Sequence, residues 1–236
     1  MNREPQREPT FFDNVNRAFT GLNHDISKDT QEHLRNVYAT VGAGIFSSAL
    51  GVAFYFLTGF TQGLFFSLAS FYLIYKVYTT GPETDANRMA MFLAFCGING
   101  IGLGPLIHVT LEIDGSILLT SILASAAIFG CFTMAALKAT STKYLHLGGT
   151  LSSALLFLLF GSFFLSHSVL LWGGLAVACG FILYDTQMIV EKNRRGDNDY
   201  LRHALELFID FANVFRHILI LLAQKKDNER RNKRKD

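Results

Sequence analysis

The sequence predicts an all-α membrane protein that crosses the bilayer several times. Half of the 236 residues are hydrophobic, only 17% are charged, and Phe alone accounts for 22 positions. This composition is typical of a polytopic membrane protein and not of a soluble domain. Most of the apolar segments approach the roughly twenty residues that a helix needs to cross the hydrocarbon. They cover residues 37–57, 63–80, 89–111, 117–137, 144–165, 169–190 and 201–223.

The ends of the chain are polar. Residues 1–36 contain Pro5, Pro9 and scattered charges, so they form an N-terminal extension and not a signal peptide, which would have a short basic start and an apolar core. Residues 27–30 (SKDT), followed by Glu32, predict the start of a helix that leads into the membrane. We therefore expect a polar extension over 1–36, a transmembrane domain over 37–223 and a basic tail over 224–236.

Lys and Arg alternate between the connecting loops. Basic residues stand before the first segment and in or beside the second, fourth and sixth loops, whereas the first, third and fifth loops contain none. Because basic loops stay in the cytosol, the N-terminus is predicted to be cytosolic. The tail disagrees, since seven crossings would place its seven Lys or Arg residues on the far side. Either segment seven enters and returns without crossing, or packing overrides the tail charge.

Small residues predict close helix packing. Segment three contains Gly100, Gly102, Gly104 and Pro105, which should weaken or bend its helix and could form a hinge. Segments one and six also carry pairs of small residues four apart, which allow two backbones to approach in lipid. These pairs are Gly44/Ser48, Ser47/Gly51, Gly174/Ala178 and Ala176/Gly180.

Segment seven is the most polar. Glu206, Asp210, Asn213 and His217 fall at i, i+4, i+7 and i+11, on one face of a helix. Charges at membrane depth cost about 3 kcal/mol each on insertion scales and usually mark ion paths or proton relays. The alternative is that Glu206, His217 and the adjacent Arg216 lie near the membrane surfaces. Asp210 would then only hydrogen-bond to Thr186, Gln187 or another helix.

Two aspartates are expected to meet. Asp185 precedes the short polar loop 193–199 and Asp210 follows it, which puts both roughly 10 to 15 Å below one membrane surface at about 1.5 Å per residue. Ionised carboxylates about 4 Å apart repel by roughly 4 kcal/mol at an effective dielectric of 20, so the pair should share one proton near neutral pH. Calcium prefers roughly six to eight oxygen ligands and the pair offers about four, so any metal binding at Asp185 and Asp210 should be weak and transient.

Several motifs carry a family resemblance. They are residues 184–192 (YDTQMIVEK), 196–200 (GDNDY) and 207–216 (LFIDFANVFR), with 102–105 (GLGP), 128–133 (IFGCFT) and the basic tail. Together they resemble the Bax inhibitor-1 family of transmembrane Bax-inhibitor-motif proteins, over essentially the whole chain from about residue 27.

The resemblance implies a fold and a function. The fold is a seven-helix bundle in which the last helix is enclosed by the other six. The function is that of an endoplasmic-reticulum protein that restrains cell death and ER stress and lowers stored calcium, as a pH-sensitive calcium leak channel or a calcium/proton exchanger. In bacterial relatives an aspartate pair, matched here by Asp185 and Asp210, is the pH sensor and couples to an arginine on the second helix. Here Lys76 is the only base on that segment.

Other classes of function fit the sequence less well. Asp210 lacks the glycines that frame the second aspartate of intramembrane aspartyl proteases, and no Gly-x-Ser-x-Gly or His-Glu-x-x-His sequence occurs, so neither an enzyme nor a cofactor is expected. Nothing predicts a nucleic-acid partner. The stronger rival is a non-transporting adaptor in the lipid bilayer that binds Bcl-2-type death regulators or ER calcium channels, with a tail that contacts anionic headgroups.

Overall fold

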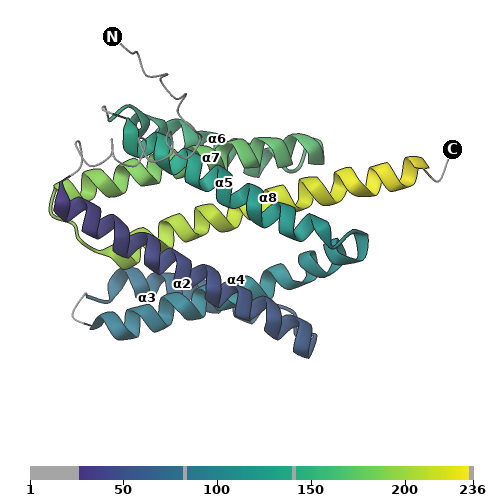
Figure 1. The fold of residues 1–236 in the computed structure, drawn as a ribbon, viewed down its shortest axis with the longest axis horizontal. Coiled ribbons are helices and arrows are strands. Elements are labelled where there is room, and N and C mark those ends of the chain that lie inside the picture. The colour runs from purple at the N-terminus through teal and green to yellow at the C-terminus, as the bar shows by residue number, and fades with distance from the viewer. Residues whose placement is uncertain (1–26, 82–83, 140–141, 234–236) are drawn as a thin grey trace, which may run out of the picture.

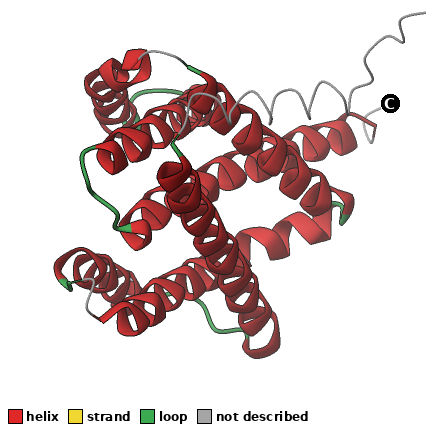
Figure 2. Cartoon of the chain, turned by 60° about the vertical axis from the view of Figure 1, so that its left-hand side comes forward, coloured by secondary structure: helices red, strands yellow, loops and turns green. Residues whose placement is uncertain are grey.

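The chain folds entirely into helices. The computed structural model describes residues 27–81, 84–139 and 142–233, and within these ranges it contains seven α-helices, one short 3₁₀-helix and no strand (Figures 1 and 2). This confirms the predicted fold class. The elements are α2 (Lys28–Thr58), α3 (Leu64–Thr79), α4 (Asp85–Ile113), α5 (Ser116–Lys138), η2 (Thr142–His146), α6 (Leu147–Gly161), α7 (His167–Arg194) and α8 (Tyr200–Lys233).

Successive helices run back and forth between two ends of the bundle (Figure 1). Five helical segments are long and apolar enough to cross a membrane: α2, α4, α5, α7 and Tyr144–Gly161, which contains α6. Of the other two helices, α3 is apolar but has 16 residues, and α8 has 34 residues but carries the polar face. The architecture is that of a multi-pass membrane protein.

The last helix lies among the others. Helix α8 packs against α2, α4, α5 and α7 and makes a smaller contact with α3, and its residues Leu201, Leu207 and Leu219 are fully buried. It is uninterrupted over 34 residues, or about 50 Å at 1.5 Å per residue. A helix of this length does not turn back within the membrane, so the alternative of a re-entrant last segment is wrong.

Helix α2 begins where the sequence predicts a start. Ser27 is its N-cap, and the Ser27 hydroxyl accepts a hydrogen bond from the Thr30 backbone N–H at 3.3 Å. The helix therefore starts within the predicted polar extension, and its first turns bury His33 and Leu34 against the bundle. Residues 1–26 of that extension lie outside the described residues.

Glycines bring α2 and α4 close together. A Cβ atom on Gly51 would overlap the Gly97 carbonyl group, and one on Gly100 would overlap the backbone of Ser48. Helix α4 continues through Pro105 as one helix. The visible role of these glycines is thus close packing, and a hinge at this place stays a prediction.

The same principle holds for the other small residues. On α4, Gly102 faces the Gln62 amide and Gly104 faces the ring of Tyr55. On α7, Gly174 faces the His217 ring of α8. Small residues on α2, α4 and α7 therefore set the spacing of the bundle, as the pairs of small residues indicate.

The start of the basic tail lies at the end of the bundle opposite the N-terminus of α2 (Figure 1). Lys226 of α8 forms an ion pair with Asp114, in the α4–α5 turn, at 3.2 Å. Hydrogen bonds from Ser116, together with Lys226, lower the pKa of Asp114 to about 2, so this carboxylate is charged at physiological pH. Arg234 and Lys235 of the tail lie outside the described residues.

This geometry predicts the sidedness of the chain. In a cysteine-free background, Gly115→Cys and Glu229→Cys should react with a membrane-impermeant maleimide from one side of sealed vesicles. Ser27→Cys should react from the other side, because α2 to α8 make an odd number of crossings. The measurement is labelling before and after permeabilisation, and reaction of Glu229→Cys and Ser27→Cys from the same side would contradict the arrangement.

The close α2–α4 contact predicts a contrast between two glycines of one helix. Gly51→Ala should destabilise the protein by about 1–3 kcal/mol, because the new methyl group meets the Gly97 carbonyl group. Gly42→Ala is the matched control: its Cβ would have no atom within 4 Å, so stability should be unchanged or slightly higher. Thermal unfolding in detergent measures both, and equal unfolding temperatures would argue against the contact.

Candidate functional site

Asp185 of α7 and Asp210 of α8 meet in the structure. Their carboxyl groups lie close enough to interact; Asp210 is only 6% exposed, and Asp185 is half-buried. Ionised carboxylates only accept hydrogen bonds, so a bond between the two groups would require a proton on one of them. The second carboxyl oxygen of Asp210, Oδ2, is buried and has no hydrogen-bond partner among the described residues. The two carboxyl groups are thus placed to share one proton, and Asp210 Oδ2 has no hydrogen-bond partner within the ranges that the structure describes.

The α7–α8 turn sets the two aspartates at the same depth. Gly196 has a φ of 94°, a conformation that favours glycine, and the Asn193 side-chain amide donates a hydrogen bond to Asn198 across the turn at 2.6 Å. The hydroxyl of Thr30, in the first turn of α2, donates to Asn193 at 2.7 Å. The turn is therefore fixed both internally and to the N-terminal helix.

A buried arginine anchors the start of α8. Arg88 of α4 is 1% exposed; it donates to the Asp199 carboxylate at 2.6 and 2.9 Å and to the Val77 carbonyl at 3.0 Å. Arg202 adds a second ion pair with Asp199 at 2.9 Å. The sequence identified Arg88 only as a loop charge, because its partner lies 111 residues away.

Glu206, one turn before Asp210, has its own partners. Its carboxylate accepts a hydrogen bond from the Tyr78 hydroxyl at 2.9 Å and forms an ion pair with Lys192 at 3.3 Å. Sequence reasoning missed both partners at this site. Lys192 follows Asp185 by seven residues and so lies on the same face of α7, a signal that could have identified it. Tyr78, from α3, gave no such signal.

Lys76 of α3 packs against an aromatic ring. Its Nζ lies 5.7 Å from the centroid of the Tyr72 ring, and in the described parts of the chain no ion pair joins it to Asp185 or Asp210. The basic residue whose positive charge acts on the Asp185 carboxyl group is Lys192.

Of the remaining predicted site residues, Asn213 and His217 line a cavity beside the acid pair, whereas Arg216 and Gln187 do not. His217 lines a cavity with Asn213, and its Nδ1 donates to the Asn213 carbonyl oxygen at 2.7 Å. Arg216 is exposed and is not part of the lining of this cavity. The Gln187 amide accepts from the Tyr144 backbone N–H at 3.0 Å, so this side chain ties η2 to α7.

The acid pair faces a cavity of about 610 Å³ between α6, α7 and α8. One wall is the polar face of α8, where all four residues of the predicted i, i+4, i+7, i+11 pattern lie. The other walls are mainly leucine and small apolar residues of α6 and α7. The lining comprises Leu155, Leu158, Leu159, Ser162, Leu170, Gly174, Val177, Ala178, Phe181, Asp185, Glu206, Ile209, Asp210, Asn213 and His217.

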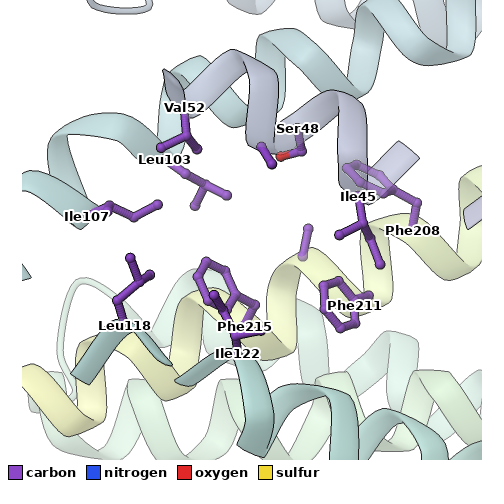
Figure 3. A pocket seen from close by; sticks show the side chains of 12 residues that line it. Ile45, Ser48, Val52, Leu103, Ile107, Leu118, Ile122, Phe208, Phe211 and Phe215 are labelled. Carbon is purple, nitrogen blue, oxygen red and sulfur yellow. The ribbon is translucent and has the colours of Figure 1, made fainter. Parts of the chain in front are cut away.

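The opposite face of α8 borders a second cavity, of about 250 Å³ (Figure 3). Phe208, Phe211 and Phe215 of α8 point into it toward apolar side chains of α2, α4 and α5, and Ser48 is the polar residue of the lining. Apolar cavities stay dry. Helix α8 thus separates a cavity with a charged wall from an apolar one.

The described residues contain no group of three or more His, Cys, Asp or Glu side chains placed to hold a metal ion. The acid pair supplies about four carboxylate oxygens, whereas calcium takes roughly six to eight ligands. Water would have to complete the coordination of a calcium ion at Asp185 and Asp210.

Fold and site together define a class: a multi-pass α-helical membrane protein with a pair of carboxyl groups, one buried and one half-buried, between its last two helices. The family model described as "Inhibitor of apoptosis-promoting Bax1" matches residues 30–227. Bax inhibitor 1 of Homo sapiens is 39% identical over 220 residues, which cover 89% of this chain and 92% of the relative. Bax inhibitor 1 of Oryza sativa subsp. japonica is 35% identical over 221 residues, covering 89% and 88%.

The chain belongs to the Bax inhibitor 1 family. The resemblance inferred from the motifs is thereby confirmed. Membership supports an anti-apoptotic membrane protein.

The unpartnered oxygen predicts how charge changes affect stability. Asp210→Asn should leave the unfolding temperature unchanged or raise it, because an amide of the same shape removes a buried carboxyl and can donate to Asp185. Asn213→Asp, one turn along α8 in the same cavity, adds a carboxylate and should cost about 1–3 kcal/mol. Thermal unfolding at neutral pH compares them; a larger loss for Asp210→Asn would show that Asp210 has a partner that this geometry lacks.

Proposed function

We propose that this protein lets calcium cross the endoplasmic-reticulum membrane in a pH-dependent manner, and that Asp185 and Asp210 control the passage. The observation that carries the proposal is the contact between these two carboxyl groups, one buried and one half-buried, in a cavity with a polar wall. Structural roles rarely require two acids side by side at membrane depth, whereas proton-linked ion paths do.

The proposed mechanism uses the repulsion between the two acids. With a shared proton, the hydrogen bond joins α7 to α8. When the proton leaves, two negative charges about 4 Å apart repel by roughly 4 kcal/mol at an effective dielectric of 20. A divalent cation relieves this repulsion, so loss of the proton and entry of calcium favour the same separated state of the two helices.

The lining of the cavity supports this route. From Glu206 to His217 the polar face of α8 extends about 16 Å at 1.5 Å per residue. Glu206 is neutralised by Lys192, which leaves the aspartate pair as the uncompensated charge. Few ligands and partial hydration make calcium binding weak, and weak binding suits passage.

The orientation and location belong to the same proposal. The end of the bundle that carries Arg88, Lys192 and Arg202 faces the cytosol by the positive-inside rule, and the N-terminus with it. The endoplasmic reticulum is inferred from the family resemblance. The protein acts without a cofactor and without enzymatic chemistry, in restraining cell death by lowering stored calcium.

A non-transporting adaptor is the second candidate. The observation that favours it is the exposed basic end of α8, where Arg230, Arg231 and Lys233 lie on the helix surface. Such a surface, on the side of the membrane opposite the N-terminus, suits an acidic partner, for example on a calcium channel, or anionic lipid.

Calcium efflux from liposomes that contain the purified protein tests the proposal. Efflux should change with pH, and Asp185→Asn and Asp210→Asn should each abolish most of that pH dependence. Asp227→Asn is the matched control on α8, because Asp227 pairs with Arg231 on the surface at 2.9 Å, and it should behave as the unaltered protein.

The outcomes separate the candidates. Unchanged pH dependence in both amide variants would refute control by the pair. Efflux that an imposed proton gradient does not alter would exclude the exchanger and leave the channel. No efflux from the pure protein at any pH would leave the adaptor.

A further inference from the structure

The cavity at the acid pair opens sideways, past α6. Leu155 and Leu159 of α6 line the cavity, yet they are 52% and 61% exposed at the surface of the bundle. Helix α6 packs mainly against α7 and η2, and Gly161 is its one buried residue among those described. A loosely packed, leucine-rich helix in contact with lipid therefore forms the outer wall of the cavity.

The inner wall has the opposite character. Asp185, Glu206 and Asp210 line it, and the cavity lining contains no Lys or Arg. Asp210 is more than nine-tenths buried, and its Oδ2 atom lies there without a hydrogen-bond partner in the part of the chain that the structure describes. A buried acceptor without a partner is unfavourable, so a ligand that donates a hydrogen bond to it is favoured.

We propose that this cavity binds an amphipathic organic cation, a protonated alkyl or aryl amine, that enters from the bilayer. Its ammonium group donates to Asp210 Oδ2 and lies beside Asp185, and its apolar tail packs along Leu155, Leu158 and Phe181. An ammonium group offers three donors and one positive charge, which matches the acidic wall. This ligand is additional to the calcium ion of the proposed function, since an inorganic ion makes no use of the leucine residues that line the outer wall.

Size and charge agree with this ligand class. About 610 Å³ falls within the roughly 300–1,000 Å³ of small-molecule sites, which are mostly apolar with a few placed polar groups. An uncharged lipid of the same length would leave the Asp210 oxygen without a strong donor. An anionic one would be repelled by the carboxyl groups.

Photoaffinity labelling tests the proposal with the full chain in phosphatidylcholine liposomes without calcium. The probe is dodecylamine with a diazirine in its alkyl chain, and the control is dodecanol with the same diazirine. Peptide mass spectrometry should find several-fold more amine than alcohol on the α6 and α7 peptides that contain Leu155, Leu158 and Phe181. Lipid-facing α3 peptides should show no such preference.

Two variants test where the ammonium group and the apolar tail of the probe bind. Asp185→Asn combined with Asp210→Asn should reduce amine labelling of the cavity to the level of the alcohol, whereas Asp227→Asn should not change it. Val177→Phe narrows the cavity without touching the acids and should lower the labelling several-fold; thermal unfolding confirms that each variant is folded. If the double variant does not fold, the amine-to-alcohol ratio and Val177→Phe still decide.

Equal labelling by the two probes, or full amine labelling in the double or Val177→Phe variant, would overturn the inference. The readout needs no calcium gradient, so it is independent of the proposed transport. A protein that passes no calcium can still show the amine preference, and one that passes calcium can lack it.

Discussion

A carboxyl group inside an apolar bundle needs a proton, a cation or a donor, and the rest of this structure depends on that requirement at Asp210. Asp185 meets it in part, because the two carboxyl groups lie together and can share one proton. The surroundings then have to hold α7 and α8 at one depth. The α7–α8 turn, the Thr30–Asn193 bond and the buried Arg88–Asp199 ion pair do so from one end of the bundle. The charged side chains at that end form ion pairs, whereas Asp210, inside the bundle, lies beside another acid.

The two faces of α8 explain why one helix can serve as both core and site. Its phenylalanines border the apolar cavity toward α2, α4 and α5, while its acids, amide and imidazole border the cavity toward α6 and α7. Close packing through Gly51 and Gly100 makes α2 and α4 a compact support. Helix α6, in contrast, has few packed neighbours. A firm wall on one side and a loose wall on the other favour movement or ligand entry on the acidic side.

Periodicity and local signals account for what the sequence could predict. The lengths of the apolar segments predicted the helices, and Ser27 predicted the start of α2. The spacing of Glu206, Asp210, Asn213 and His217 predicted the polar wall of the cavity. Because Asp185 and Asp210 lie at similar distances from one turn, the sequence also predicted that they meet. Contacts between distant segments were out of reach: Tyr78 reaches Glu206 across 128 positions and Arg88 reaches Asp199 across 111. The sequence left the role of Lys76 open, and in the structure its side chain lies over the Tyr72 ring.

The uninterrupted course of α8 has a mechanical consequence. Asp210 and Lys226 stand on one rod, about 24 Å apart at 1.5 Å per residue, and Lys226 is tied to Asp114 at the opposite surface. If the proposed loss of the proton tilts or turns α8, that surface contact must shift as well. Ionic strength or bound anions on one side of the membrane would then be coupled to proton occupancy at Asp210, through a single rigid element and without any relay of side chains between them.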